Sequence, residues 1–418
     1  MPYPSMMRLG QHFAAPRVDD IPGTVRRQVA EVALNRRTRP GQSVAVTVGS
    51  RGIANLPLIL QSLVAQLREA GLQPFLVPAM GSHGGGTAAG QRAIIEGYGV
   101  TEKAVGAPIH ATMETVQVGQ TEDGVPVYFD RYAWEADHVV VVGRIKPHTD
   151  FVGQIESGLH KMMLIGLGKH RGASLYHRAI VHYSFDRIIR SVARTVIDRC
   201  GVLMGLAIVE NPADETALIE AVPPERFAER EKELLVLARQ WMPRLPFETI
   251  DLLIVDRIGK DISGAGMDSN VVGRKHAWHA PGEKEVPRIT RIYVRGLTEA
   301  THGNAAGLGQ AEFTHRRLVE QLDRESTYIN CLTGNAPQSA AIPLYYDTDR
   351  QVLDAALGTI GLVEPEAARV VRIHDTLHLA EVLVSQAYEP ELARRDDLTV
   401  LEPARPMEFD ASGDLLPF

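Results

Sequence analysis

Apolar and polar residues alternate in two patterns along the first part of the chain. Short apolar runs, rich in valine, isoleucine and leucine, have the length and composition of strands. Between them, apolar positions recur every three to four residues, as in amphipathic helices. The strands are predicted at 43–49, 74–80, 138–145 and 203–209, and the helices at 56–70, 90–98, 185–198 and 224–241. The run HVVVVGRI at 138–145 is typical of a parallel strand that is buried on both faces. This order of elements predicts an α/β fold.

A second set of elements begins near Phe247. The segment PRLPF carries two prolines and precedes a new apolar run, IDLLIV, at 250–255. Further strands are predicted at 289–294 and 368–373, and helices at 312–323 and 349–357. We therefore predict two α/β domains, residues 1–246 and 247–395, and a loop-like tail of residues 396–418. Packing of this tail back on the first domain is one arrangement that the sequence permits.

The composition narrows the class of protein without indicating a chemistry. The 418 residues carry a formal net charge of −7, the pI is near 6.1, and no basic stripe is present, which argues against nucleic-acid binding. No run of ~18 apolar residues exists, so no membrane span is expected. Two cysteines and an N-terminus without an apolar signal core predict a cytoplasmic protein. The sequence leaves the oligomeric state open, including a homo-oligomer.

Chemically distinctive residues follow the predicted strands. Arg51 comes after the first strand, His83 lies in the loop GSHGGGT after the second, and the segment 143–177 includes the end of the third and continues beyond it. In the second domain, a loop beginning at Lys260 follows the strand at 250–255. Ligands of open α/β sheets bind beyond the carboxyl ends of the strands, so we expect these loops to line one shared cleft.

The segment 143–177 is unusually rich in histidine, lysine and glycine. Imidazoles ligate metals and transfer protons near neutral pH, and glycines let backbone N–H groups approach a phosphate closely. His148 follows a proline that stiffens the backbone entering it, and His83 lies on a bare glycine turn. We predict functional roles for both, although an exposed loop histidine is the alternative in each case. No histidine spacing here matches a zinc motif.

The glycine-rich loops do not match a known nucleotide-binding motif. In GLGKHRGAS the lysine is not followed by the serine or threonine of a Walker A motif, and MGSHGGGT does not fit GxGxxG. Each loop is equally consistent with a phosphate cradle and with an ordinary turn. The chain contains no GxSxG nucleophile elbow, which argues against an α/β-hydrolase.

The ordered motifs as a set resemble the lactate racemase (LarA-like) family of nickel-pincer nucleotide-dependent isomerases. The motifs are GSHGGGT, then GRIKPH, then a glycine-rich run to a lysine with a histidine beyond it, and GQTEDGVPVYFDR before the GRIKPH strand. The resemblance covers about residues 40–270. It implies two α/β domains with the active site in the cleft between them. It also implies a racemase or epimerase that inverts the C2 carbon of a 2-hydroxy acid by reversible hydride transfer.

The resemblance also implies roles for individual residues. Lys161 would anchor the cofactor, a pyridinium-3-thioamide-5-thiocarboxylate mononucleotide carrying nickel, with Lys169 as the alternative anchor. His177, sixteen residues after Lys161, would ligate nickel, and His83 and His148 would be the two catalytic bases. The remaining cofactor contacts would come from the two glycine-rich loops, through Ser82, Gly84, Thr87, Gly168 and Lys169.

Two departures from the family pattern concern the substrate. The family's first loop typically reads DxxRxxP, but Ala54 stands where the arginine is expected and Arg51 lies three places earlier. In the second domain Lys260 lies in a GKDI sequence, but the glutamine and lysine that follow in lactate racemases are absent. We assign the substrate carboxylate to Arg51 and Lys260, and we expect a 2-hydroxy acid or sugar acid other than lactate.

Two other functions remain as alternatives. The same histidines could serve a metal-dependent hydrolase or lyase, although Asp150 and Glu156 are the main carboxylates beside them. A non-catalytic relative that keeps the fold is the second alternative.

Overall fold

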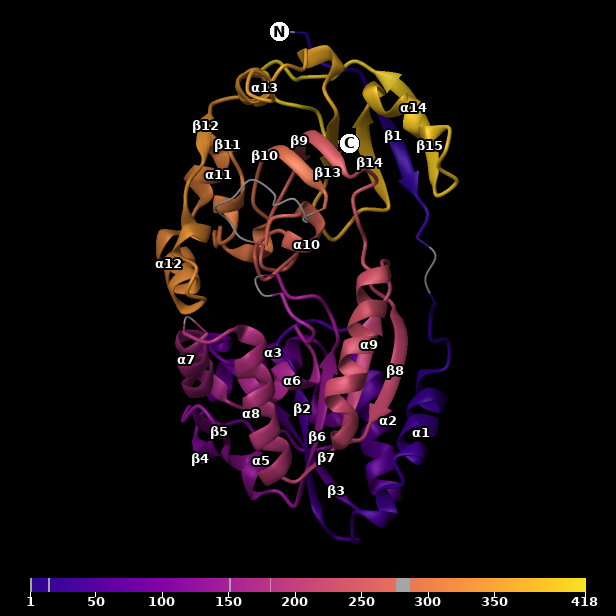
Figure 1. The fold of residues 1–418 in the computed structure, drawn as a ribbon, viewed down its shortest axis with the longest axis vertical. Helices are drawn as coiled ribbons and strands as arrows, with labels where there is room; N and C mark the ends of the chain where they lie inside the picture. Colours follow the sequence, from indigo (N-terminus) through magenta and orange to yellow (C-terminus); the bar gives the residue numbers. More distant parts are fainter. Residues whose placement is uncertain (1, 14–15, 150–151, 181, 276–285) are drawn as a thin grey trace. The chain divides into compact units, whose positions relative to one another are not determined.

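The computed structural model describes residues 2–13, 16–149, 152–180, 182–275 and 286–418 (Figure 1). The chain divides into an N-terminal unit, Ala15–Met242, and a C-terminal unit that comprises Met1–Ala14 and Pro243–Phe418. The division at residue 242 lies close to the boundary expected from PRLPF. The first residues, however, belong to the C-terminal unit and not to the first domain. Asp150, one of the carboxylates considered above, lies outside the described residues.

The N-terminal unit is built on a five-stranded sheet with the order β3-β2-β6-β7-β8. Strands β3, β2, β6 and β7 are parallel, and β8 runs antiparallel to β7. The hairpin β4–β5 forms a separate small sheet. The strands are β2 (Ser43–Val48), β3 (Gln73–Pro78), β4 (Thr115–Gln120), β5 (Pro126–Asp130), β6 (His138–Arg144), β7 (Val202–Glu210) and β8 (Thr216–Val222).

Helices cover both faces of this sheet. Along β6, Val139 and Val141 belong to the core that includes Ile188 of α8, whereas Val140 and Val142 belong to the core that includes Leu60 of α2. The unit therefore has three layers, and the absence of polar alternation in β6 follows from burial on both faces. The helices are α1 (Ile21–Glu31), α2 (Leu56–Glu69), α3 (Ala88–Gly97), α4 (Glu102–Val105), α5 (Arg131–Glu135), α6 (Leu159–Lys161), α7 (Lys169–Ala179), α8 (Phe185–Arg199) and α9 (Phe227–Gln240).

The C-terminal unit contains an eight-stranded mixed sheet with the order β12-β11-β10-β9-β13-β14-β1-β15. The pairs from β12 to β13 are parallel, and the pairs from β13 to β15 are antiparallel. The strands are β1 (Met6–Gln11), β9 (Thr249–Val255), β10 (Arg288–Val294), β11 (Phe313–His315), β12 (Leu344–Tyr346), β13 (Val370–Ile373), β14 (Glu381–Ser385) and β15 (Leu398–Arg405). The helices are α10 (Ser269–Val272), α11 (Arg316–Gln321), α12 (Arg324–Thr333), α13 (Asp349–Leu357) and α14 (Glu389–Leu392).

Both chain termini contribute to this second sheet. β1 lies between β14 and β15, with Leu9 paired to Val382 on one side and to Val400 on the other (Figure 1). Residues 396–418 are therefore not wholly loop-like, and they belong to the C-terminal unit. The cause is the ladder of hydrogen bonds between β1 and β15, which joins segments that are distant in sequence.

The predicted α/β class is confirmed. The helix predicted at 312–323 is wrong in its first part, because Phe313–His315 form β11 and only Arg316–Gln321 are helical. Parallel pairing with β10 outweighs the helical period there. None of the helices in the described part of the chain has the length and apolarity needed to cross a membrane.

Candidate functional site

Three loops that carry candidate residues leave the same edge of the N-terminal sheet. They follow β3, β2 and β6, which are adjacent and parallel, so the carboxyl ends of these strands lie side by side. The loop after β2 carries Arg51, the loop after β3 carries His83, and the loop after β6 carries His148. This is the edge at which open α/β sheets bind ligands.

The loop after β3 has three consecutive glycines with positive φ, Gly84, Gly85 and Gly86. A Cβ atom at Gly84 would lie 2.4 Å from the carbonyl carbon of Gly90, so only glycine fits there, whereas nothing lies within 4 Å of a Cβ at Gly85 or Gly86. Thr87 Oγ accepts the Gly90 N–H at 3.1 Å and caps α3. Ser82 and His83 lie half-buried at the start of this turn. The turn has open space beside Gly85 and Gly86.

The loop after β6 is organised around the buried carboxylate of Glu156. Its oxygens accept hydrogen bonds from the backbone N–H of His148 at 2.9 Å and of Gly153 at 3.0 Å, and from the Arg239 guanidinium at 2.7 Å. The His148 ring lies half-buried, with its centroid 5.8 Å from that of Phe185. Glu156 therefore fixes the backbone that carries His148 and leaves the imidazole itself to other contacts.

Lys161 ends α6, a helix of 3 residues, and a π-helical segment, Met162–Gly166, follows it directly. π-Helical segments inside helices are frequent at functional sites. The side chain of Lys161 is half-buried. His160, beside it, is buried and forms a contact of 2.6 Å through Nδ1 with Glu231 of α9.

Lys161 and His177 belong to different helices but are near enough for the charge of the lysine to act on the imidazole. Burial of the His177 imidazole, and secondly the positive charge of Lys161, lower the pKa of His177 to about 4. His177 is on the last turn of α7 and is half-buried. Its imidazole is therefore neutral at pH 7, which is the form that ligates a metal.

Lys169 is fully buried and has structural partners. Its Nζ donates to Pro78 O at 2.7 Å and to Gln91 Oε1 at 2.8 Å, and it forms an ion pair with Asp130 at 3.3 Å. Burial lowers the pKa of Lys169, and the Asp130 charge partly offsets this effect. Gly168 before it is also buried, and a Cβ there would lie 2.3 Å from Leu164 O. Lys169 thus joins the start of α7 to β3 and β5, and Gly168 allows the segment before α7 to pack closely.

Comparisons with known proteins address the first half of the chain most directly. Residues 17–186 match the family model of the lactate racemase N-terminal domain. The chain therefore carries a lactate racemase N-terminal domain. The predicted resemblance to the LarA-like family is confirmed, and this family supports an enzyme of the racemase or isomerase kind.

Two solved structures are similar to this chain. The lactate racemase apoprotein from Thermoanaerobacterium thermosaccharolyticum has a TM-score of 0.50 and 13% sequence identity, and the similarity covers 87% of this chain and 93% of that one. A protein from Thermotoga maritima has a TM-score of 0.49 and 13% identity, with coverage of 68% and 71%. A comparison with curated proteins gave no match. At this identity the apoprotein supports the fold alone.

The two candidate carboxylate-binding residues, Arg51 and Lys260, belong to different units. Arg51 is exposed after β2, and Arg144 at the end of β6 is near enough for its charge to act on Arg51. Arg144 itself forms an ion pair with Glu210. Lys260 is half-buried in the C-terminal unit after β9, where its Nζ donates to Gly264 O.

Several residues that organise these loops were not predicted from the sequence. They are Glu156, Glu231, Arg239, Arg144 and Glu210. Each has at least one partner that is distant in sequence. Glu231 and Arg239 lie in a charged helix that has the pattern of an ordinary solvated surface. Only the tertiary contacts identify them.

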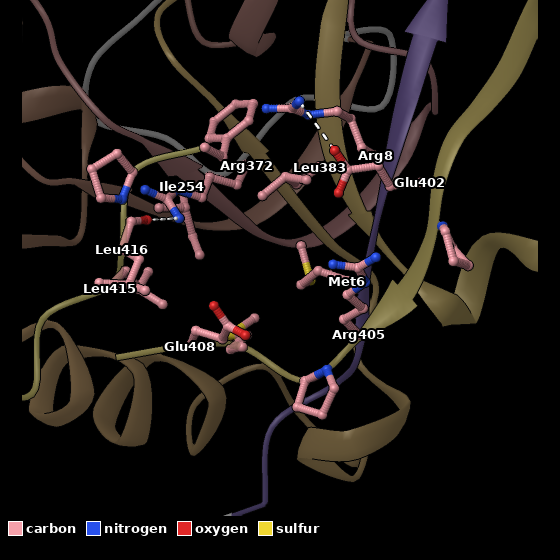
Figure 2. Close-up of a pocket in the computed structure, with 15 residues that line it drawn as sticks. Met6, Arg8, Ile254, Arg372, Leu383, Glu402, Arg405, Glu408, Leu415 and Leu416 are labelled. Carbon is pink, nitrogen blue, oxygen red and sulfur yellow. Dashed lines mark hydrogen bonds and ion pairs between the residues drawn. The ribbon is translucent and has the colours of Figure 1, made fainter. Parts of the chain in front are cut away.

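The C-terminal unit has a pocket and a cluster of potential metal ligands away from these loops. The pocket has a volume of about 230 Å³ and is lined among others by Arg8, Arg372 and Phe418 (Figure 2). None of the candidate catalytic, cofactor-binding or substrate-binding residues predicted from the sequence lines it. The ligand atoms of His315, Asp349 and Asp414 lie within 4.8 Å of one another. Arg317 already contacts both of these carboxylates, and Arg295 also binds Asp349, so the cluster is an ion-pair network.

Proposed function

We propose that this protein is a racemase or epimerase that inverts the C2 carbon of a 2-hydroxy acid or sugar acid other than lactate. In this proposal a nickel-pincer nucleotide is tethered to Lys161 and its nickel is ligated by His177. The observation that carries the proposal is that the charge of Lys161 acts on a neutral His177 within the region that matches the lactate racemase N-terminal domain. A primary amine and an uncharged imidazole are the two groups that such a cofactor requires from the chain.

The residues present fit the cofactor in two further respects. Nothing lies within 4 Å of a Cβ at Gly85 or Gly86, so a phosphate would have room to approach this turn closely, although the Gly86 N–H itself already donates to Ser82 O. Lys169 is held by Asp130, Pro78 and Gln91, which favours Lys161 over Lys169 as the anchor. When bound, the cofactor would supply the ring that accepts and returns a hydride.

The chain's own residues would move the proton and hold the substrate. The C–H bond beside a carboxylate is a very weak acid, so removal of hydride together with the hydroxyl proton is the easier route to a planar 2-oxo acid. Two stereoisomers present their hydroxyl groups on opposite sides, which requires two bases, and we assign these to His83 and His148. Arg51 and Lys260 would bind the substrate carboxylate, since a guanidinium can grip it through two hydrogen bonds.

The experiment is purification from a host that makes the cofactor, followed by metal analysis and intact-mass measurement. We expect about one nickel per chain and an added mass that peptide mapping assigns to Lys161. Lys161→Ala should carry neither, whereas Lys103→Ala, at an exposed position, should match the wild type. A wild-type protein without nickel and with only its encoded mass would contradict the proposal.

The same measurement distinguishes the alternatives. Zinc or manganese without an adduct would favour a metal-dependent hydrolase or lyase, and an unmodified, metal-free protein would favour a non-catalytic relative. The substrate is then sought by incubating the loaded enzyme in D₂O with a panel of 2-hydroxy acids. Hydride return preserves the substrate's own hydrogen at the inverted carbon, whereas proton exchange would introduce deuterium.

A further inference from the structure

Glu231 of α9 and His160 form a buried pair directly before Lys161. Glu231 Oε2 lies 2.6 Å from His160 Nδ1 and accepts the His160 backbone N–H at 3.2 Å. The side chains are only 1% and 3% exposed, respectively. One carboxylate oxygen therefore contacts both the ring and the main chain of the residue that precedes Lys161.

The second oxygen of Glu231 lies against Gly158, the residue directly before the same short helix. A Cβ atom at Gly158 would lie 2.4 Å from Glu231 Oε1, and the φ of Gly158 is +150°. Among the described residues Oε1 has no hydrogen-bond partner. A buried carboxylate oxygen without a partner is costly, so a purely structural position would be better served by an uncharged side chain.

The helix that ends at Lys161 cannot fix the orientation of this lysine by itself. α6 has 3 residues, far below the length at which a helix is stable alone, and the π-helical segment follows at once. The position of Lys161 therefore depends on tertiary contacts of its neighbours. The contact between His160 and Glu231 is a buried polar contact of this kind.

We propose that Glu231 is a positioning residue, which acts through His160 to hold Lys161 in the orientation required for covalent attachment of the cofactor. The role of Lys161 as the anchor rests on the proposed function. Its restraint by Glu231 does not, and it can be measured on protein without cofactor.

The test compares the rate at which an amine-acylating reagent modifies Lys161 in cofactor-free wild type and in Glu231→Gln, read by peptide mass spectrometry. The variant keeps the size of the side chain but removes its charge, so the restraint on Lys161 should weaken and its acylation should accelerate roughly tenfold, the factor expected for one hydrogen bond to a charged group. Glu233→Gln, an exposed substitution on the same helix, should leave the rate unchanged.

Lys169 provides the internal control for a general loss of structure, because it is fully buried elsewhere in the same unit. Acceleration at Lys161 with Lys169 still protected supports the proposal. Equal acceleration of both lysines, or an unchanged rate at Lys161, would overturn it.

If Glu231→Gln does not yield folded protein, Glu231→Asp serves instead. It keeps the charge but shortens the side chain, and should give a smaller acceleration at Lys161 alone. An unchanged rate, or acceleration of both lysines, in that variant again overturns the proposal.

The loaded protein separates this proposal from the proposed function. In a host that makes the cofactor, Glu231→Gln should carry several-fold less adduct on Lys161 than wild type or Glu233→Gln. Failure of wild type to form any adduct would refute the anchor role, while the acylation comparison would still decide whether Glu231 restrains Lys161.

Discussion

His177 on α7 has a pKa of about 4 because partial burial desolvates its imidazole and because the positive charge of Lys161 on α6 acts on it. The two residues are thereby linked electrostatically before any cofactor is present. Removing the charge of Lys161 should raise the pKa of His177, but not to the ordinary value of 6.5, since burial is the larger cause.

Lys161→Met tests this relationship. The His177 pKa can be measured by NMR of protein with labelled histidine, in the absence of metal. The folded pKa lies below the unfolded one, so the stability contributed by His177 is present above pH 6.5 and is lost as the pH falls towards 4. Lys161→Met should therefore lose less stability than the wild type as the pH falls from 6.5 towards 4. Lys103→Met should behave as wild type, and an unchanged His177 pKa in Lys161→Met would show that the two residues are not coupled.

His83 and His148 should act on opposite stereoisomers. Because a catalyst cannot change an equilibrium constant, His83→Ala must reduce kcat/KM equally in both directions, by roughly 10²–10⁴-fold. The oxidative half-reaction separates the roles. In single-turnover experiments, His83→Ala should convert only one stereoisomer of the substrate to the 2-oxo acid, and His148→Ala only the other. Both variants should retain nickel, and loss of nickel in either would mean that a ligand has been mistaken for a base.

Lys169 should matter for stability and not for attachment of the cofactor. Lys169→Met leaves the fully buried Asp130 without its partner, which should cost ~3–5 kcal/mol of the free energy of unfolding. Lys169→Met/Asp130→Asn removes both charges and should recover part of this loss, as urea unfolding would show. If folded Lys169→Met lacks the adduct while Lys161→Met retains it, the assignment of the anchor is reversed.

The C-terminal unit should lose stability in acid through Asp349. Burial alone would raise the pKa of Asp349, but hydrogen bonding to Arg295 and the nearby positive charges outweigh this effect and lower it below 3.8. The stability contributed by this carboxylate is therefore present above pH 3.8 and is lost as the pH falls through its folded pKa.

Asp349→Asn tests this contribution. The variant should be less stable than wild type at pH 7, and its stability should fall less steeply below pH 4, as measured by urea unfolding between pH 7 and pH 2.5. The exposed Asp19→Asn provides the control. If the free energy of unfolding of Asp349→Asn falls as steeply below pH 4 as that of the wild type, Asp349 is not ionised more readily in the folded protein than in the unfolded chain.

The sequence determined much of the N-terminal fold because burial leaves a direct pattern. Runs such as 138–145 became strands, and the loops after β2, β3 and β6 lie at one sheet edge, because parallel strands align their carboxyl ends. The hydrophobic pattern also located β9, β10 and α13 in the C-terminal unit. It could not show that β1 joins the C-terminal sheet, since strand pairing between residues 6–11 and 381–405 has no local signal.

The sequence by itself determined the α/β class, the order of the histidine and glycine motifs and the family to which they point. Only the tertiary structure decided that Lys169 is held by Asp130 and that the charge of Lys161 acts on His177. It also decided that Glu156 binds the backbone of His148 and that Glu231 contacts His160. The physical reason is that periodicity and motif order are local properties of the chain. Burial of a charge and the partner that neutralises it depend on segments that meet only after folding.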